Sequence, residues 1–199
     1  MSNEFKKGQW SGGFPETVSG SGSTMKNTLG VREFLPRVIK EYKIKTVFDA
    51  PCGDRNWVKA LDFDGLDCTY SGADIVPEIV ADINLPFVRV FDIRIDTPPV
   101  VDLWLCRDCL FHLSESDIKI ALCNMVTDSE IQYLLVTSHT MDAQQDKLNR
   151  DISTGDFRVL ILEEHNYFGL QAPIAIFKDP SDSYISKVMM LFDLQQTQQ

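Results

Sequence analysis

Apolar residues in this chain form short runs that alternate with segments of helical spacing, a pattern typical of an α/β protein. Runs rich in β-branched and aromatic residues predict five buried strands, at 46–50, 70–75, 88–92, 101–106 and 133–137. Apolar spacing predicts helices from near Met25 to near Tyr42, over 55–61, and over 115–125 with Ser114 as N-cap. This alternation implies a parallel sheet with helices on both faces, in which the carboxyl ends of the strands share one edge.

The C-terminal part of the chain departs from this alternation. Apolar runs at 174–177 and 185–194 flank a turn-rich connection and predict an antiparallel hairpin. The long, weakly periodic stretch 138–173 is more typical of a lid or binding loop than of filler. We therefore expect a mostly parallel seven-stranded sheet with a C-terminal hairpin in a single domain over 25–199.

Composition limits the classes of protein to which this chain can belong. The chain has 199 residues, 44% of them hydrophobic and 24% charged, as in a soluble globular domain. Because no apolar run approaches the roughly 20 residues of a membrane span and the first residues resemble no signal peptide, we expect no membrane contact and a cytoplasmic location. A net charge of −10 argues against broad contact with a nucleic-acid backbone, and the oligomeric state stays open.

The five cysteines are predicted to be free thiols, because their number is odd and the location is cytoplasmic. Cys106 and Cys109 have the C-x-x-C spacing of half a zinc site. No second knuckle supplies the other two ligands, so the pair is interpreted as small residues at the end of a buried strand, and no metal site is predicted.

Acidic residues stand at or beside the ends of four predicted strands: Asp49, Asp74, Asp92 and Asp108. Charges at that edge need water, a ligand or a partner. Asp74 is placed to accept hydrogen bonds from both hydroxyls of a ribose, although a turn or capping aspartate has the same position. Asp92 and Ile93 could frame an adenine, with a plain turn acid as the alternative and Asp82 as a rival.

The turn after the first strand, Asp49-Ala50-Pro51-Cys52-Gly53-Asp54, is short, and Gly53 lets the backbone approach a ligand. A dinucleotide fold would place G-x-G-x-x-G here to admit a pyrophosphate, whereas this turn has a single glycine. A nucleoside cofactor without a pyrophosphate fits better. The sequence of this turn is also compatible with a plain strand-to-helix turn that binds no ligand.

In combination, these motifs resemble those of class I S-adenosylmethionine-dependent methyltransferases, in which 49–54 matches the first motif, 70–74 the ribose acid and 102–108 the fourth motif. The chain is similar in particular to a group of bacterial and phage methyltransferases of uncertain substrate. The segments that carry this closer likeness are Trp10, 18–24, 49–57, 106–112 and 154–158. The chain departs from the broad class at Pro51 and Arg55, where glycines are usual.

The resemblance implies a Rossmann-like methyltransferase fold and S-adenosyl-L-methionine as the cofactor. The residues expected to bind it are Ser23, Asp49, Ala50, Pro51, Gly53, Trp57, Asp74, Ile75, Asp92, Ile93 and Arg107. Composition alone predicts a flexible tail over 1–24, because the segment is rich in glycine and serine, whereas the resemblance makes it a flap over the cofactor.

The implied activity is methyl transfer by direct displacement to a small-molecule, sugar or protein acceptor, with a small molecule or glycan favoured over nucleic acid. His112 is the first candidate for a base, although a packed core histidine is an equally good interpretation of it, and Asp108 is a further catalytic candidate on the acceptor side. Weaker candidates for the acceptor side are Arg107, His139, Arg158 and His165, while Tyr167 and Phe168 could form a wall of the pocket, with plain packing as an equally good interpretation. A protein that binds the cofactor without turnover and a nucleotide-binding oxidoreductase are the alternatives.

Overall fold

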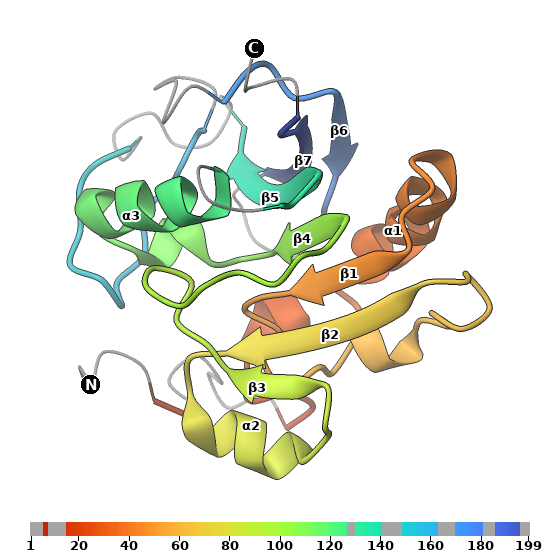
Figure 1. The fold of residues 1–199 in the computed structure, drawn as a ribbon. Helices are drawn as coiled ribbons and strands as arrows, with labels where there is room; N and C mark the ends of the chain where they lie inside the picture. The colour runs from red at the N-terminus through yellow and green to blue at the C-terminus, as the bar shows by residue number, and fades with distance from the viewer. Residues whose placement is uncertain are drawn as a thin grey trace.

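The computed structural model describes residues 6–7, 15–126, 130–140, 149–162, 170–180 and 186–195. They contain a seven-stranded sheet with the strand order β3-β2-β1-β4-β5-β7-β6 (Figure 1). Its strands are β1 Thr46–Asp49, β2 Thr69–Asp74, β3 Val88–Val90, β4 Leu103–Cys106, β5 Tyr133–His139, β6 Ala175–Lys178 and β7 Lys187–Asp193. Strands β1 to β5 pair in parallel, and β7 is antiparallel to both β5 and β6. The predicted sheet and its C-terminal hairpin are confirmed.

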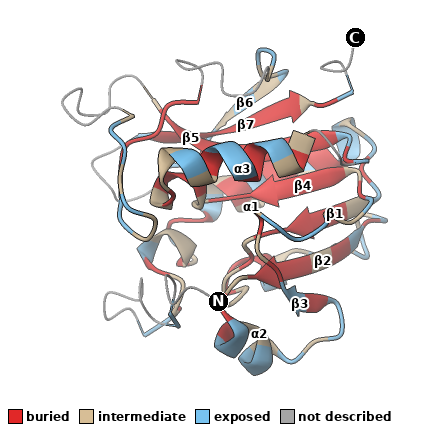
Figure 2. Cartoon of the chain, turned by 60° about the vertical axis from the view of Figure 1, so that its left-hand side comes forward, coloured by how far each residue is buried: buried red, intermediate tan, exposed pale blue. Residues whose placement is uncertain are grey.

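Helices cover both faces of the sheet, as expected. The helices are α1 Leu29–Glu41, α2 Pro77–Ile83 and α3 Glu115–Val126, with short 3₁₀ turns η1 Ser21–Ser23, η2 Val58–Ala60 and η3 Leu110–His112. In Figure 1, α3 lies in front of the sheet and α1 behind it. Alternate residues of each strand pack on opposite sides, so that Phe48 joins the core under α3 while Val47 joins the core under α1. Figure 2 shows the central strands buried and parts of α3 exposed, and the edge strands β3 and β6 are partly exposed as well.

Two helix predictions need correction. The first helix begins at Leu29 rather than near Met25, because turns that start at Thr24 precede it. The helix expected over 55–61 is wrong, since the structure has only η2 there. Arg55 has a left-handed φ of 58°, which is incompatible with starting a helix at that residue.

The strand order indicates a ligand site at the carboxyl end of β1. The chain continues from β1 to β2 on one side, whereas β4 lies on the other, so the connections diverge between β1 and β4. In open α/β sheets a ligand crevice forms at such a switch point. Of the helices in the described ranges, none is long and apolar enough to cross a bilayer.

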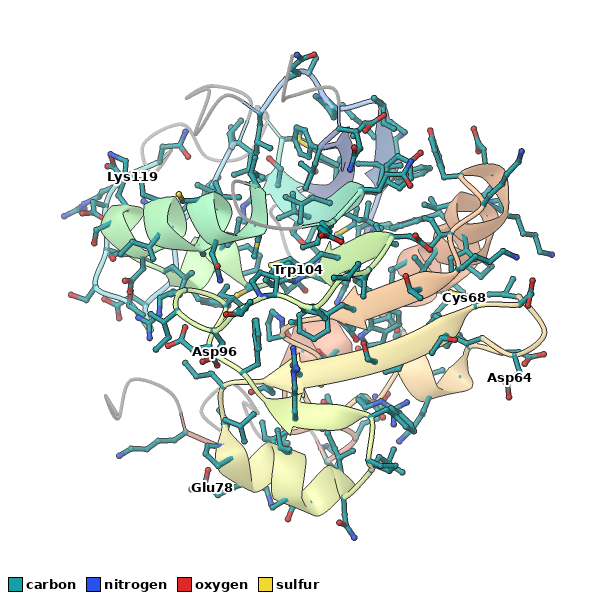
Figure 3. All side chains as sticks on the ribbon, viewed as in Figure 1. Asp64, Cys68, Glu78, Asp96, Trp104 and Lys119 are labelled. Atoms are coloured by element: carbon teal, nitrogen blue, oxygen red, sulfur yellow. The ribbon has the colours of Figure 1, made fainter. Side chains whose placement is uncertain are left out.

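Trp104 links the core to the turn after β1. Its side chain lies at the middle of the sheet (Figure 3) and is fully buried, and its indole Nε1 donates to the carbonyl of Ala50 over 3.0 Å. The ring therefore holds the turn after β1 in a fixed position relative to the core.

Trp104→Phe removes that donor and part of the ring. We expect the free energy of unfolding to fall by roughly 1–3 kcal/mol, because a buried carbonyl loses its partner and a small cavity remains. Urea denaturation measures this loss. An unchanged midpoint would show that the turn does not depend on Trp104.

Candidate active site

A cavity of about 740 Å³ lies at the carboxyl edge of the sheet, within the range typical of ligand pockets. The predicted site residues that line it are Ser23, Asp49, Pro51, Gly53, Trp57, Asp74, Ile75, Asp92, Ile93, Arg107, Asp108 and His112. Ala50 does not line it and is 1% exposed in the core. The structure therefore brings together residues from segments spread over most of the chain.

Asp74 ends β2 with a buried carboxylate. One oxygen accepts the N–H of Gly53 over 3.0 Å, and the other accepts the N–H of Val76 over 2.9 Å. Burial raises the pKa of Asp74, although these N–H groups favour its charged form. Because each carboxylate oxygen has a second lone pair, the group is held in place and can still accept bonds from hydroxyls in the cavity.

Asp49 ends β1 and is 2% exposed. One of its oxygens accepts the hydroxyl of Tyr70 over 2.8 Å. Burial raises the pKa of Asp49 to about 7, although Tyr70 and the guanidiniums of Arg55 and Arg107 oppose that rise. At neutral pH this carboxyl is therefore poised to gain or lose a proton when a ligand arrives.

Asp92 lies beyond β3, where its carboxylate forms a bidentate ion pair with Arg94. The guanidinium donates from Nε to one oxygen over 2.9 Å and from an Nη to the other over 2.8 Å, and its remaining Nη donates to Asp117 of α3 over 2.9 Å. Although burial alone would raise it, the pKa of Asp92 is lowered by Arg94. Ile93 and Arg94 line the cavity beside it.

Residues 15–24, which we call the strap, form one wall of the cavity. The Asp54 carboxylate accepts the hydroxyl of Thr17 and the N–H of Val18, each over 2.8 Å, and the Asp54 N–H donates to Ser19 Oγ over 2.8 Å. A Cβ at Gly53, which has a φ of 54°, would lie 2.8 Å from the Cβ of Ser19. Gly53 is thus required both by its backbone angle and by the close approach of the strap.

A buried cluster of alternating charges connects the strap to the end of β4 and to the hairpin of β6 and β7. Arg107, at the end of β4, donates to the carbonyl of Gly22 over 2.9 Å and to Asp179 over 2.9 Å. Lys187 of β7 donates to both oxygens of Asp108, over 2.5 and 2.7 Å. Burial would raise the pKa of Asp108, but Arg107 and Lys187 lower it to about 2. Asp108 is therefore an anion held between two cations, a poor arrangement for a base.

The two imidazoles at the cavity have opposite tautomers. His112 Nδ1 lies 2.8 Å from the carbonyl of Asp156, which can only accept, so Nδ1 carries the proton. His139 Nδ1 lies 3.0 Å from the backbone nitrogen of Leu160, whose N–H can only donate, and 3.3 Å from the Leu160 carbonyl, which already accepts the backbone N–H of His139 over 2.8 Å. The shorter contact therefore places the proton of His139 on Nε2. Burial lowers the pKa of both rings, that of His139 to about 4, which keeps them neutral at pH 7.

Two residues that line the cavity escaped sequence analysis. Lys187 and Phe157 line the cavity, although neither was a candidate, and no local motif marks the lysine. Phe157 belongs to the 154–158 motif, so its segment was the available signal. Arg158 is buried and does not line the cavity. Trp10, His165, Tyr167 and Phe168 lie outside the described residues.

No family model matches the chain, and neither does the sequence of any curated protein. Several solved structures are similar in fold. The mitomycin 7-O-methyltransferase MmcR has a TM-score of 0.61 at 13% identity, over 88% of this chain and 55% of its own. Human N-acetylserotonin methyltransferase, in complex with S-adenosylmethionine, has a TM-score of 0.54 at 11% identity, over 88% and 59% respectively.

The methyltransferase domain of bacterial CtHen1-CN has a TM-score of 0.61 at 15% identity, over 84% of this chain and 99% of that domain. This chain thus spans little more than half of the first two proteins and nearly all of the third. Identities this low establish the fold alone. The chain therefore has the Rossmann-like fold of S-adenosylmethionine-dependent methyltransferases.

Asp49→Asn tests the buried carboxyl. Because the folded state raises the pKa of Asp49 from its ordinary 3.8 to about 7, the folded protein holds this proton more tightly than the unfolded chain. The carboxyl therefore loses stabilising effect as pH rises from about 4 to about 7. We expect Asp49→Asn to become more stable than the wild type across that window, by up to about 4 kcal/mol, and to keep this advantage above pH 7. Thermal melts of the cofactor-free proteins at several pH values measure the difference, and a difference independent of pH would contradict it.

Gly22→Ala tests how tightly the strap is fastened. An added Cβ would lie 2.5 Å from an Asp108 oxygen that Lys187 holds in place. We expect the free energy of unfolding to fall by roughly 1–3 kcal/mol because of overpacking. Urea denaturation measures the loss, with Ser21→Ala of the same 3₁₀ turn as the matched control. Equal stability of the two variants would show that the strap is loosely held.

Proposed function

We propose that this protein transfers a methyl group from S-adenosyl-L-methionine to a small-molecule, glycan or protein acceptor. The observation that carries the proposal is the pair of buried carboxylates, Asp49 and Asp74, that line one cavity at the ends of adjacent parallel strands. We further propose that residues 25–199 act as one catalytic domain in the cytoplasm, with the N-terminal 24 residues as a flap.

The residues present suit this cofactor chemically. Asp74 offers carboxylate oxygens to the hydroxyls of a ribose, while Ile75 and Ile93 supply apolar contacts beside it. Asp49 offers a carboxyl to the amino group of the methionine moiety, and its raised pKa would fall as a cation arrives. Asp92 would hold the adenine only if it shared its oxygens with Arg94.

The bound cofactor would supply a methyl group on a positively charged sulfur. The chain's own contribution is chiefly to hold the acceptor in line with that methyl group, and orientation of this kind contributes roughly 7–11 kcal/mol. The strap and the charge cluster would exclude water from the same space. His112, whose Nδ1 proton is committed to Asp156, has the tautomer that a base requires. Asp108, the other predicted catalytic residue, serves better as an anchor for Lys187.

Asp74→Ala tests the cofactor site. We expect affinity for S-adenosylhomocysteine to fall about tenfold or more, because bonds between a charged group and two hydroxyls are lost. Calorimetry measures the change. Asp82→Ala is the matched control, since Asp82 is an exposed aspartate of α2 outside the cavity.

An unchanged affinity in Asp74→Ala would remove Asp74 from the site. Tight binding of NAD in place of S-adenosylmethionine would overturn the proposed function. Binding of S-adenosylmethionine with no methyl transfer to any component of a cell extract would favour a non-catalytic role.

A further inference from the structure

Part of the cavity is lined by flat rings from three separate segments. The ring of Phe111 lies 4.5 Å from that of His112, 5.0 Å from that of His139 and 5.5 Å from that of Phe157, measured between centroids. Phe157 is in turn 5.9 Å from each imidazole. We call these four residues the aromatic end. Rings that meet at such distances offer a flat ligand both faces and edges to pack against.

The position of Phe157 is fixed by the backbone on either side of it. The N–H of Gly155 donates to the carbonyl of His112 over 2.8 Å, and the N–H of Arg158 donates to the carbonyl of Phe111 over 3.1 Å. Although Phe157 is 49% exposed, its side chain is therefore held at the rim of the cavity. An exposed phenyl ring held in this way can cover a ligand and gain burial on binding.

The charges that border the aromatic end are paired with one another. Lys187 contacts Asp108 over 2.5 Å, and Arg107 contacts Asp179 over 2.9 Å, so the two cations are each matched by an anion. The imidazoles are neutral at pH 7, since burial lowers the pKa of both. A charged ligand would leave water for a site without an opposite net charge, which is costly. An uncharged ligand avoids that cost.

The tautomers of the two histidines supply one acceptor and one donor. Because Nδ1 of His112 donates to Asp156, its Nε2 has the lone pair that can accept a proton. Because Nδ1 of His139 accepts from Leu160, its Nε2 carries a hydrogen to donate. These roles suit a ligand that has a hydroxyl to donate and a second oxygen or nitrogen to accept.

We propose, on the basis of the methyl transfer proposed above, that the methyl acceptor is an uncharged, planar aromatic molecule with a ring hydroxyl and a second hydrogen-bond acceptor. The ring packs against Phe111 and Phe157, and the second acceptor binds His139. The hydroxyl proton moves to Nε2 of His112, the oxygen forms a bond to the methyl carbon, and the bond from that carbon to sulfur breaks with its electron pair going to sulfur. The products are an aryl methyl ether, a neutral thioether and a proton that His112 returns to water.

The first test compares probes on protein loaded with S-adenosylhomocysteine. The probe is 2,3-dihydroxynaphthalene, which is planar and uncharged and has adjacent oxygens. Its comparators are the anionic 3-hydroxy-2-naphthoate and the non-planar decalin-2,3-diol. We expect calorimetry to show the probe bound at least about tenfold more tightly than either comparator, a difference of about 1.4 kcal/mol. Equal or tighter binding of a comparator would overturn the proposed acceptor class.

Variants test the individual residues. Phe157→Ala should weaken probe binding about fivefold or more without changing the affinity for S-adenosylhomocysteine. Ile176→Ala, which removes a similarly exposed side chain from β6 outside the cavity, should change neither. If Phe157→Ala binds the probe like the wild type, the aromatic end is not the acceptor site.

His112→Asn tests whether His112 acts as a base or only packs in the structure, because an Asn amide can still donate to the carbonyl of Asp156. With S-adenosylmethionine and the probe, we expect formation of the methyl ether, measured by mass spectrometry, to fall about 100-fold or more. Probe binding should change far less. Equal losses of binding and rate would assign His112 to packing alone.

The two levels of the proposal fail differently. Absence of S-adenosylmethionine binding would overturn both methyl transfer and its acceptor. Binding of S-adenosylmethionine together with a preference for the charged or non-planar probe would overturn the acceptor class and leave methyl transfer standing.

Discussion

The cluster of Arg107, Asp108, Asp179 and Lys187 is the interaction on which the geometry of the site depends. These side chains come from the end of β4, the end of β6 and the start of β7, and Arg107 also reaches the strap. Buried charges are costly unless paired, and removing one member of a buried pair typically costs about 3–5 kcal/mol. The cluster is therefore complete only when the hairpin, the parallel strands and the strap are all in place. The cavity takes its shape only when these three parts of the fold have formed together.

The same cluster separates two electrostatic environments within one cavity. On the side of β1 and β2, buried carboxylates with raised pKa values face the space, and they favour hydroxyls and cations. On the side of β5 and β7, paired charges and neutral imidazoles surround aromatic rings. The proposed sulfonium cofactor and the proposed uncharged aromatic acceptor suit these two sides respectively.

Sequence analysis anticipated the elements whose signals are local. The carboxyl ends of parallel strands share an edge, so the acids that follow the apolar runs could be assigned to one site from their positions in the chain. Segments whose conformation depends on distant partners were not anticipated. The helix expected over 55–61 does not form there, and next to it Asp54 binds the strap, which lies more than 30 residues away in the sequence. Strand β5 extends to His139, beyond the predicted end at 137, because Ser138 and His139 pair with Val188 and Lys187 of β7.

The strap has a consequence for how the protein matures. Arg107 reaches Gly22 across 85 positions of sequence, and Lys187 reaches Asp108 across 79. Contacts between residues so far apart in the chain form late, and Lys187 is synthesised after all five parallel strands. The nascent chain can therefore complete its parallel strands well before it has a closed pocket. A ligand of this cavity would therefore bind chains whose C-terminal hairpin has docked, and it would stabilise them over chains in which the hairpin is still undocked.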